Sequence, residues 1–359
     1  MKPIKILLLI ATICCSGNSF AQTWTQTSAP SNHWSTLASS ADGTKLAATV
    51  YGGGIYVSTN SGANWTLTSA PITYWNSVAS SADGIKLVAT SDNLSPTDGW
   101  VYVSTNSGLT WVQTSLPTNY WGSVASSADG VKLVATAPGV FGYGPAAIYT
   151  STNSGATWTE QTNFSPTPSV RPSWASVASS ADGTKLVVSG FRIYHSTNSG
   201  TTWTESGAPL FSGGFVSPSQ VIASSADGCK WVVGFTHDLN TSGPSPIYTS
   251  TNLGTTWTLT SAPSNQWTSV ACSADGMKII AVAIQGSSSV PIYTSTNFGI
   301  TWRSNNISNA NWITVASSSD GGKLAAASGM NGDDGQIFVS KSISTPRLNV
   351  SSANNNLKV

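Results

Sequence analysis

The tetrapeptide Asp-Gly-x-Lys occurs seven times in this chain of 359 residues, beginning at Asp42, Asp83, Asp129, Asp182, Asp227, Asp275 and Asp320. Successive copies lie 41, 46, 53, 45, 48 and 45 residues apart. A period of this length is typical of proteins built from one repeated supersecondary unit. The repeat constrains the fold more than any other feature, and it predicts seven similar units in a row.

A second signature, Ser-Thr-Asn-x-Gly-x-x-Trp, follows the first in six of the seven units. The seventh unit lacks it and ends in residues 337–341 instead. We expect the recurring Ser, Asn, Gly and Trp of each copy to be structural residues of a tight turn: Ser58, Asn60, Gly62, Trp65, Ser104, Asn106, Gly108, Trp111, Ser151, Asn153, Gly155, Trp158, Ser196, Asn198, Gly200, Trp203, Ser250, Asn252, Gly254, Trp257, Ser295, Asn297, Gly299 and Trp302.

Each unit shows the pattern of four short strands joined by turns. In the third unit, residues 121–127 and 132–136 are predicted strands on either side of Asp-Gly, the pair favoured in two-residue hairpins. After a loop of variable length, residues 148–151 and 157–162 flank a second turn. Four antiparallel strands per unit, repeated seven times, predict an all-β fold: a seven-bladed β-propeller of four-stranded blades.

The two ends of the repeat region complement each other. Residues 23–30 match residues 64–71, the fourth strand of a unit, but no unit precedes them. The seventh unit lacks that strand, so pairing the N-terminal strand into the last blade would close the ring and leave no exposed sheet edge. We therefore expect one propeller domain over residues 22–344, and residues 345–359 to be a tail or the start of a further module.

The second signature resembles the Asp box, also called the BNR repeat, Ser-x-Asp-x-Gly-x-x-Trp. That motif belongs to sialidases, sortilin-like receptors, exo-acting glycosidases and the photosystem II assembly factor family, all of them β-propellers. Every copy here has Asn where the family usually has Asp, and an Asn side chain can still accept the backbone N–H bonds of the turn. In the family the box is a folding element away from the active site, so the resemblance implies the fold and leaves the function open.

Composition and the N-terminus indicate an extracellular protein. Charged residues make up 8% of the chain, against roughly 25% in ordinary globular proteins, and the formal net charge is +1. This balance favours no nucleic-acid partner. Residues 1–21 read as a secretory signal with cleavage before Gln22, which predicts a protein that is secreted, periplasmic or on the cell surface, with no membrane span. Cys229 and Cys272 would then be the remaining cysteines, able to form at most one disulfide.

Few acids and bases remain for catalysis once the turn residues are set aside. Glu160 and Glu205 are expected on outer strands, far from the axis of a propeller, while Asp98 and Asp238 fall in variable loops and form the one plausible acid pair. The three histidines share no metal-ligand spacing, and no phosphate-binding loop or nucleophile elbow occurs. We therefore assign no catalytic residue, metal or cofactor.

The loops that vary between units are all expected on one face, which we call the variable face; the other, with the repeated turns, is the uniform face. Each connection between blades ends on the variable face in a tryptophan, except in the fifth unit, and a tyrosine precedes two of them. Two interpretations stay open: the rings seal the blades, or they form platforms on which sugars stack. The candidate ligand-binding residues are Trp34, Tyr74, Trp75, Tyr120, Trp121, Trp174, Trp267 and Trp312.

The predicted function is a secreted, monomeric, non-enzymatic binding propeller that recognises a glycan or another extracellular polymer. Aromatic faces beside Asn and Ser, with few charges, suit neutral sugars. The first alternative is a sialidase-like or other glycoside hydrolase, which needs convergent acids. The second is an assembly or adhesion scaffold with a protein partner, which needs a contiguous apolar patch.

Overall fold

The computed structural model describes residues 22–92, 99–139, 145–165, 173–190, 192–207, 220–235, 245–284, 290–305, 307, 310–329 and 334–342. Within these residues it contains 29 strands and no helix. No helix in this part of the chain is long and apolar enough to cross a membrane. Asp98 and Asp238, the acid pair considered from the sequence, lie outside the described residues.

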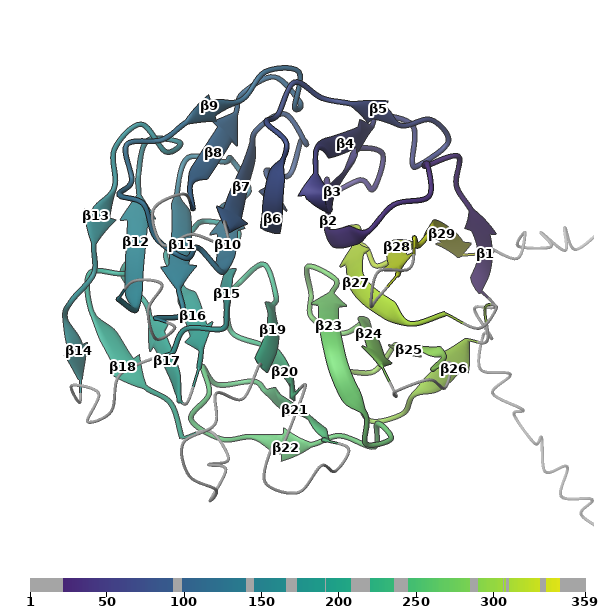
Figure 1. The fold of residues 1–359 in the computed structure, drawn as a ribbon. Coiled ribbons are helices and arrows are strands. Elements are labelled where there is room, and N and C mark those ends of the chain that lie inside the picture. Colours follow the sequence, from purple (N-terminus) through teal and green to yellow (C-terminus); the bar gives the residue numbers. More distant parts are fainter. Residues whose placement is uncertain are drawn as a thin grey trace, which may run out of the picture.

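The strands form seven units of four, arranged in a ring (Figure 1). The innermost strands are β2 (Trp34–Ser39), β6 (Thr73–Ser80), β10 (Ser123–Ser126), β15 (Ser176–Ser179), β19 (Gln220–Ser224), β23 (Gln266–Cys272) and β27 (Trp312–Ser317). The second strands are β3 (Leu46–Gly53), β7 (Leu87–Asp92), β11 (Leu133–Ala137), β16 (Leu186–Ser189), β20 (Trp231–Phe235), β24 (Ile279–Ile284) and β28 (Lys323–Ser328).

The third strands are β4 (Ile55–Ser58), β8 (Val101–Ser104), β12 (Ala147–Ser151), β17 (Ile193–Ser196), β21 (Ile247–Ser250), β25 (Ile292–Ser295) and β29 (Ile337–Ser342). The outer strands are β5 (Thr66–Leu67), β9 (Val112–Gln113), β13 (Thr159–Glu160), β18 (Trp203–Glu205), β22 (Thr258–Leu259), β26 (Arg303–Asn305) and β1 (Gln22–Gln26). The remaining strand, β14 (Phe164–Ser165), pairs in parallel with β18 and extends the fourth blade.

Ring closure by the N-terminal strand is confirmed. Strand β1 pairs antiparallel with β29, with Thr23 opposite Lys341 and Gln26 opposite Phe338. The first strand of the repeat region thus completes the last blade, as the complementary ends predicted. The architecture is a β-propeller, in which every blade has a neighbour on both sides.

A circle of seven backbone hydrogen bonds links the blades on the uniform face. In each unit the residue before the Asp-Gly turn donates its N–H to the carbonyl of the corresponding residue in the next unit, at 2.7 or 2.8 Å. The circle runs from Ala41 to Ala82, Ala128, Ala181, Ala226, Ala274 and Ser319, and Ser319 donates back to Ala41. Because every member is both donor and acceptor, the turns cannot shift independently.

The Asp-Gly turns form because the Asp side chain satisfies its own hairpin. In the fourth blade, Asp182 Oδ1 accepts hydrogen bonds from Ser180 Oγ at 2.6 Å and from the Thr184 N–H at 2.9 Å. Gly183 takes a φ of +65°, a backbone conformation that disfavours residues with a Cβ. These contacts fix the turn geometry that the sequence predicted.

The box turns are held by a second set of side-chain bonds. In the third blade, Ser151 Oγ accepts the N–H of Gly155 at 2.9 Å and donates to Asn153 Oδ1 at 3.0 Å. The same Oδ1 accepts the N–H of Thr157, while Asn153 Nδ2 donates to Thr157 Oγ1 at 2.9 Å. The amide thus bonds as both acceptor and donor, which explains how Asn takes the place where the related motif has Asp.

Candidate functional site

The six tryptophans that end the blade connections lie in the interior. Their side chains are between 0% and 2% exposed. Each packs edge-on against an aromatic ring of the third strand of its own blade, with ring centroids 5.4 to 5.7 Å apart, in the pairs Trp34–Tyr56, Trp75–Tyr102, Trp121–Tyr149, Trp174–Tyr194, Trp267–Tyr293 and Trp312–Phe338. A buried indole offers no face to a sugar, so the stacking role expected for these six is incompatible with their burial.

Several of these indoles also join neighbouring blades. Trp34 Nε1 donates to the carbonyl of Gly335 at 3.2 Å, and Trp75 Nε1 donates to that of Gly53 at 3.1 Å. Gly335 lies between the second and third strands of the seventh blade, and Gly53 is the last residue of the second strand of the first blade, so each indole bonds to the blade before its own. The alternative interpretation, that the tryptophans seal the blades, therefore accounts for them.

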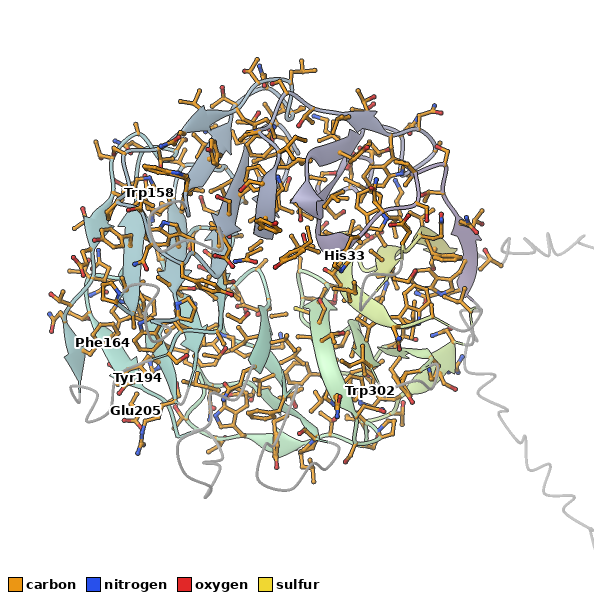
Figure 2. All side chains as sticks on the ribbon, viewed as in Figure 1. His33, Trp158, Phe164, Tyr194, Glu205 and Trp302 are labelled. Atoms are coloured by element: carbon orange, nitrogen blue, oxygen red, sulfur yellow. The ribbon has the colours of Figure 1, made fainter. Side chains whose placement is uncertain are left out.

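Tyr74 takes part in an aromatic cluster at the seam between the first two blades. Its ring centroid lies 4.9 Å from that of Tyr51, and Tyr51 in turn lies 5.3 Å from His33 in an edge-on arrangement. Tyr51 is 38% exposed, and His33 and Tyr74 are half-buried. Figure 2 shows His33 close to the middle of the ring of blades. We call His33, Tyr51 and Tyr74 the aromatic cluster.

An unusual pairing between two blades positions this cluster. Strand β3 runs past its own blade and pairs with β6 of the second, with Tyr51 opposite Tyr74 and Gly53 opposite Thr73. The register shifts between these two pairs, and Gly52 there has a φ of +73°. A Cβ on Gly52 would lie at an ordinary 3.5 Å from Cε1 of Tyr74, so it is the positive φ, and not crowding, that favours glycine at this position.

Apolar and acidic groups border the aromatic cluster. Ile72 is 70% exposed and Leu67 is 50% exposed, and both lie against Gly54, directly after the cluster's Gly-rich turn. Asp92 is buried and stands opposite Tyr74 in the pairing of β6 with β7. Among the described residues, the site therefore combines ring faces and hydroxyls with two exposed apolar side chains at Gly54 and with the carboxylate of Asp92.

The second tyrosine predicted for the site lies at a different seam. Tyr120 is half-buried, and its backbone N–H bonds to the side chain of Asn119 at 2.8 Å. Asn119 donates its own N–H to the carbonyl of Gly99, so this tyrosine sits between the second and third blades. Tyr74 and Tyr120 therefore occupy corresponding places in adjacent units.

Sequence reasoning did not single out His33 and Tyr51, although a signal for His33 exists. His33 precedes Trp34 as Tyr74 precedes Trp75 and Tyr120 precedes Trp121. No repeated sequence position identifies Tyr51, because its contact with Tyr74 depends on how far β3 extends into the next blade.

The two glutamates considered from the sequence lie apart on outer strands. Glu160 and Glu205 lie on the outer strands β13 and β18, as expected. Glu160 accepts a hydrogen bond from the Tyr149 hydroxyl at 3.1 Å, and Glu205 forms an ion pair with Arg192. No group of three His, Cys, Asp or Glu that could hold a metal occurs in this part of the chain, and Cys229 and Cys272 are free thiols.

No protein-family model matches the chain, and no curated protein matches its sequence. Among solved structures, a GH74 xyloglucanase from Xanthomonas campestris superposes with a TM-score of 0.65 at 15% identity, over 88% of this chain and 55% of that one. An ancestral GH74 enzyme superposes with a TM-score of 0.60 at 16% identity, over 88% of this chain and 47% of that one. The chain thus spans about half the length of these enzymes.

Two further similar structures match this chain over nearly their own whole length. YCF48 from Cyanidioschyzon merolae superposes with a TM-score of 0.61 at 14% identity, over 89% of this chain and 98% of its own. YCF48 bound to a D1 peptide superposes with a TM-score of 0.59 at 13% identity, over 90% of this chain and 97% of its own. At these identities the likeness establishes the β-propeller fold that all four share with this chain, and nothing finer.

Proposed function

We propose that this protein is a non-enzymatic binding propeller of the Asp-box type, whose ligand lies on the aromatic cluster of His33, Tyr51 and Tyr74. The observation that carries the proposal is the partly exposed contact of three rings at one seam of the variable face. Aromatic rings with polar edges are common anchors of binding sites, since they bury a large area at low cost in side-chain entropy. A glycan or another extracellular polymer is the ligand class that these rings and hydroxyls suit best.

A peptide is the second candidate ligand. The support is the full-length superposition on YCF48, one structure of which holds a D1 peptide, together with exposed Ile72 and Leu67 beside the cluster. Apolar side chains of a peptide would pack on these two residues, whereas a neutral sugar would use mainly the rings. Alanine substitution of Ile72 therefore separates the two ligand classes.

Glycoside hydrolysis is the alternative activity, in view of the GH74 enzymes among the similar structures. A hydrolase needs two carboxyl groups facing one bond. Asp92 is the described carboxylate nearest in the sheet to the aromatic cluster, standing opposite Tyr74. Turnover of xyloglucan or of a model sialoside that disappears in Asp92→Asn would favour the hydrolase over the binding propeller.

A glycan array combined with a peptide library, both probed with residues 22–359, tests the proposal. Retention of a glycan by the wild type and its loss in Tyr51→Ala support it. Retention only of peptides, with loss in both Tyr51→Ala and Ile72→Ala, supports the second candidate. The proposed export to the cell exterior is tested separately, by sequencing the N-terminus of the exported protein, which should begin at Gln22.

A further inference from the structure

The thiol of Cys229 lies beside the amine of a lysine from the preceding blade. Lys185 Nζ is 3.3 Å from Cys229 Sγ. Cys229 occupies the variable position of the fifth Asp-Gly-x-Lys turn, where the other six turns have Thr44, Ile85, Val131, Thr184, Met277 and Gly322. The fifth turn is therefore the only one of the seven whose variable residue is a cysteine.

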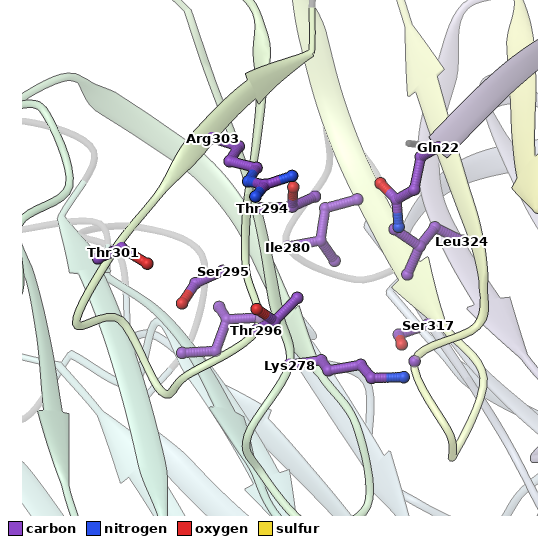
Figure 3. Close-up of a pocket in the computed structure, with 12 residues that line it drawn as sticks. Gln22, Lys278, Ile280, Thr294, Ser295, Thr296, Thr301, Arg303, Ser317 and Leu324 are labelled. Atoms are coloured by element: carbon purple, nitrogen blue, oxygen red, sulfur yellow. The ribbon is translucent and has the colours of Figure 1, made fainter. Parts of the chain in front are cut away.

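The repeated packing between blades determines where the lysine amine lies. The aliphatic part of Lys185 packs over Gly228, where a Cβ would lie 2.7 Å from Cβ and 2.9 Å from Cδ of the lysine. Its Nζ donates to the carbonyl of Asp227 at 2.6 Å. Lysines at three other seams make the same bond, in the pairs Lys45–Asp83, Lys230–Asp275 and Lys278–Asp320. Figure 3 shows one of these, Lys278, extended from the sixth blade toward the turn of the seventh.

The thiol is fixed from its own side of the seam. The Cys229 N–H donates to Asp227 Oδ1 at 2.9 Å, and Cys229 Sγ lies 3.6 Å from the same Asp227 carbonyl oxygen that the lysine contacts. The N–H of Ala181 donates to the carbonyl of Ala226 at 2.7 Å and so ties the two turns together. The nitrogen and the sulfur are therefore held close together without any change in the backbone.

The second cysteine has different surroundings. Cys272 ends strand β23 and packs against the hydrophobic cluster that contains Trp267. Removal from water raises the pKa of the Cys272 thiol to about 12. The thiolate is the form of cysteine that reacts with oxidants, so Cys272 should react slowly. Cys229 is half-buried, which leaves part of its side chain open to a small oxidant from the solvent.

We propose that Lys185 and Cys229 are a modification site, at which hydrogen peroxide links Nζ to Sγ as a sulfenamide. The link joins the fourth and fifth blades covalently on the uniform face, next to the hydrogen bond between Ala181 and Ala226. A sulfenic acid condenses with a backbone nitrogen in the same manner, and here the nearby nitrogen belongs to a lysine. The site is independent of the aromatic cluster and of its ligand.

The link forms in two steps. The Cys229 sulfur attacks one oxygen of hydrogen peroxide, so that an S–O bond forms and the O–O bond breaks; the sulfur becomes a sulfenic acid, and the other oxygen leaves as water with the thiol proton. The neutral Nζ of Lys185 then attacks this sulfur, so that an S–N bond forms and the S–O bond breaks. The hydroxyl leaves as water with a proton from the nitrogen. One thiol, one amine and one peroxide thus give one sulfenamide and two waters.

Mass spectrometry of residues 22–359, first reduced and then treated with hydrogen peroxide, tests the proposal. The wild-type protein should lose the mass of two hydrogens, and one cross-linked peptide should contain both Lys185 and Cys229. Trypsin should no longer cleave after Lys185, because its amine is blocked. Dithiothreitol should restore the original mass, since a thiol attacks the sulfenamide sulfur and releases the amine.

Matched variants identify the two reacting atoms. Cys229→Ser and Lys185→Met should each abolish the loss of two hydrogens, whereas Cys272→Ser should retain it, which distinguishes the link from a disulfide between the two cysteines. Lys45→Met removes the equivalent lysine at a seam whose turn has Ile85 in place of cysteine, and it should react as the wild type does. The proposal is overturned if peroxide only adds oxygen to Cys229, if the cross-link retains a peroxide oxygen, or if Lys185→Met still loses two hydrogens.

Discussion

Lys323 in the last blade lies directly over Gly43 in the first, where a Cβ on the glycine would fall 2.9 Å from both Cβ and Cδ of the lysine. The same contact occurs at every seam, in the pairs Lys45–Gly84, Lys86–Gly130, Lys132–Gly183, Lys185–Gly228, Lys230–Gly276 and Lys278–Gly321. The Gly of one Asp-Gly-x-Lys copy and the Lys of the copy in the preceding blade therefore meet between blades. This explains why lysine recurs in the motif, which a hairpin turn alone does not require.

Replacing one of these glycines should destabilise the protein through both strain and crowding. Gly183→Ala places a Cβ at a φ of +65° and 2.8 Å from Lys132. We therefore expect the unfolding free energy to fall by about 2–4 kcal/mol. Gly52→Ala is the matched comparison, since its φ is +73° but its nearest contact would be an ordinary 3.5 Å. Gly52→Ala should lower the unfolding free energy by only about 1–2 kcal/mol. Urea unfolding measures both, and equal losses would show that the lysine contact does not matter.

Deleting residues 23–30 should open the ring. The third strand of the last blade would lose its partner, and the indole of Trp24 would leave the hydrophobic cluster that contains Trp312. An unpaired strand edge promotes association between chains. We expect aggregation or a large fall in melting temperature, measured by size-exclusion chromatography and thermal unfolding. A truncated protein that stays monomeric and melts at the wild-type temperature would contradict closure by this strand.

Acid should weaken the turns of the uniform face. The hydrogen bond from Ser180 Oγ, followed by that from the Thr184 N–H, lowers the pKa of Asp182 from 3.8 to about 2. The corresponding aspartates also have lowered pKa values, with a serine hydroxyl as the largest cause in each. A folded-state pKa below the unfolded one stabilises the protein above pH 3.8, and this contribution is lost as the pH falls toward 2.

Urea unfolding of the wild type and of Asp182→Ala at pH 7, 4 and 2 measures this contribution. The difference in unfolding free energy between the two should be largest at pH 7 and smallest at pH 2. The side chain of Asp182 is largely exposed, so solvent screening makes the effect of a single turn small. A difference that stays constant with pH would show that the ionised carboxylate contributes nothing specific.

Most of the fold could be predicted from the sequence, because local chemistry determines it. The Asp-Gly and Ser-Thr-Asn-x-Gly turns fix both hairpins of a blade, and seven copies fix the repeat. Closure followed from two incomplete ends that complement each other, residues 23–30 and the seventh unit. The contact between Lys323 and Gly43 could not be predicted, because periodicity does not tell which residues of neighbouring units face each other.

The candidate site was harder to predict for the same physical reason. The positions of Trp75 and Trp121 indicated aromatic rings at the variable face, but their burial depends on loops of the preceding blade and on the tyrosines of the third strands. Tyr51 reaches Tyr74 only because β3 pairs with β6 beyond its own blade.

Adjacent residues at the second seam should respond differently to substitution. Trp121 is fully buried and packs against Tyr149, so Trp121→Ala should cost about 3–5 kcal/mol of unfolding free energy. Tyr120→Ala, at a half-buried ring beside it, should cost clearly less. Chemical denaturation compares the two. If Trp121→Ala keeps wild-type stability, the indole does not seal the blade and a role in ligand contact becomes open again.

The aromatic cluster leads to the prediction that bears most directly on function. Replacing Tyr51 or Tyr74 by Ala should weaken binding of the ligand found on the array by about 1–2 kcal/mol, roughly tenfold, because a partly exposed ring loses its contact with the ligand. Tyr51→Ala should change the unfolding free energy little, since Tyr51 is 38% exposed. Fluorescence or calorimetric titration measures the affinity, and thermal unfolding confirms that each variant is folded.

Ile85→Ala provides the control on the opposite face. Ile85 occupies the variable position of an Asp-Gly-x-Lys turn and is 40% exposed, close to the exposure of Tyr51. Its loss removes a similar amount of accessible apolar surface from a face where the same turn recurs in every blade. Affinity should remain within error of the wild type. If Ile85→Ala weakens binding and the two tyrosine variants do not, the ligand lies on the uniform face, and the aromatic cluster serves only to join the first two blades.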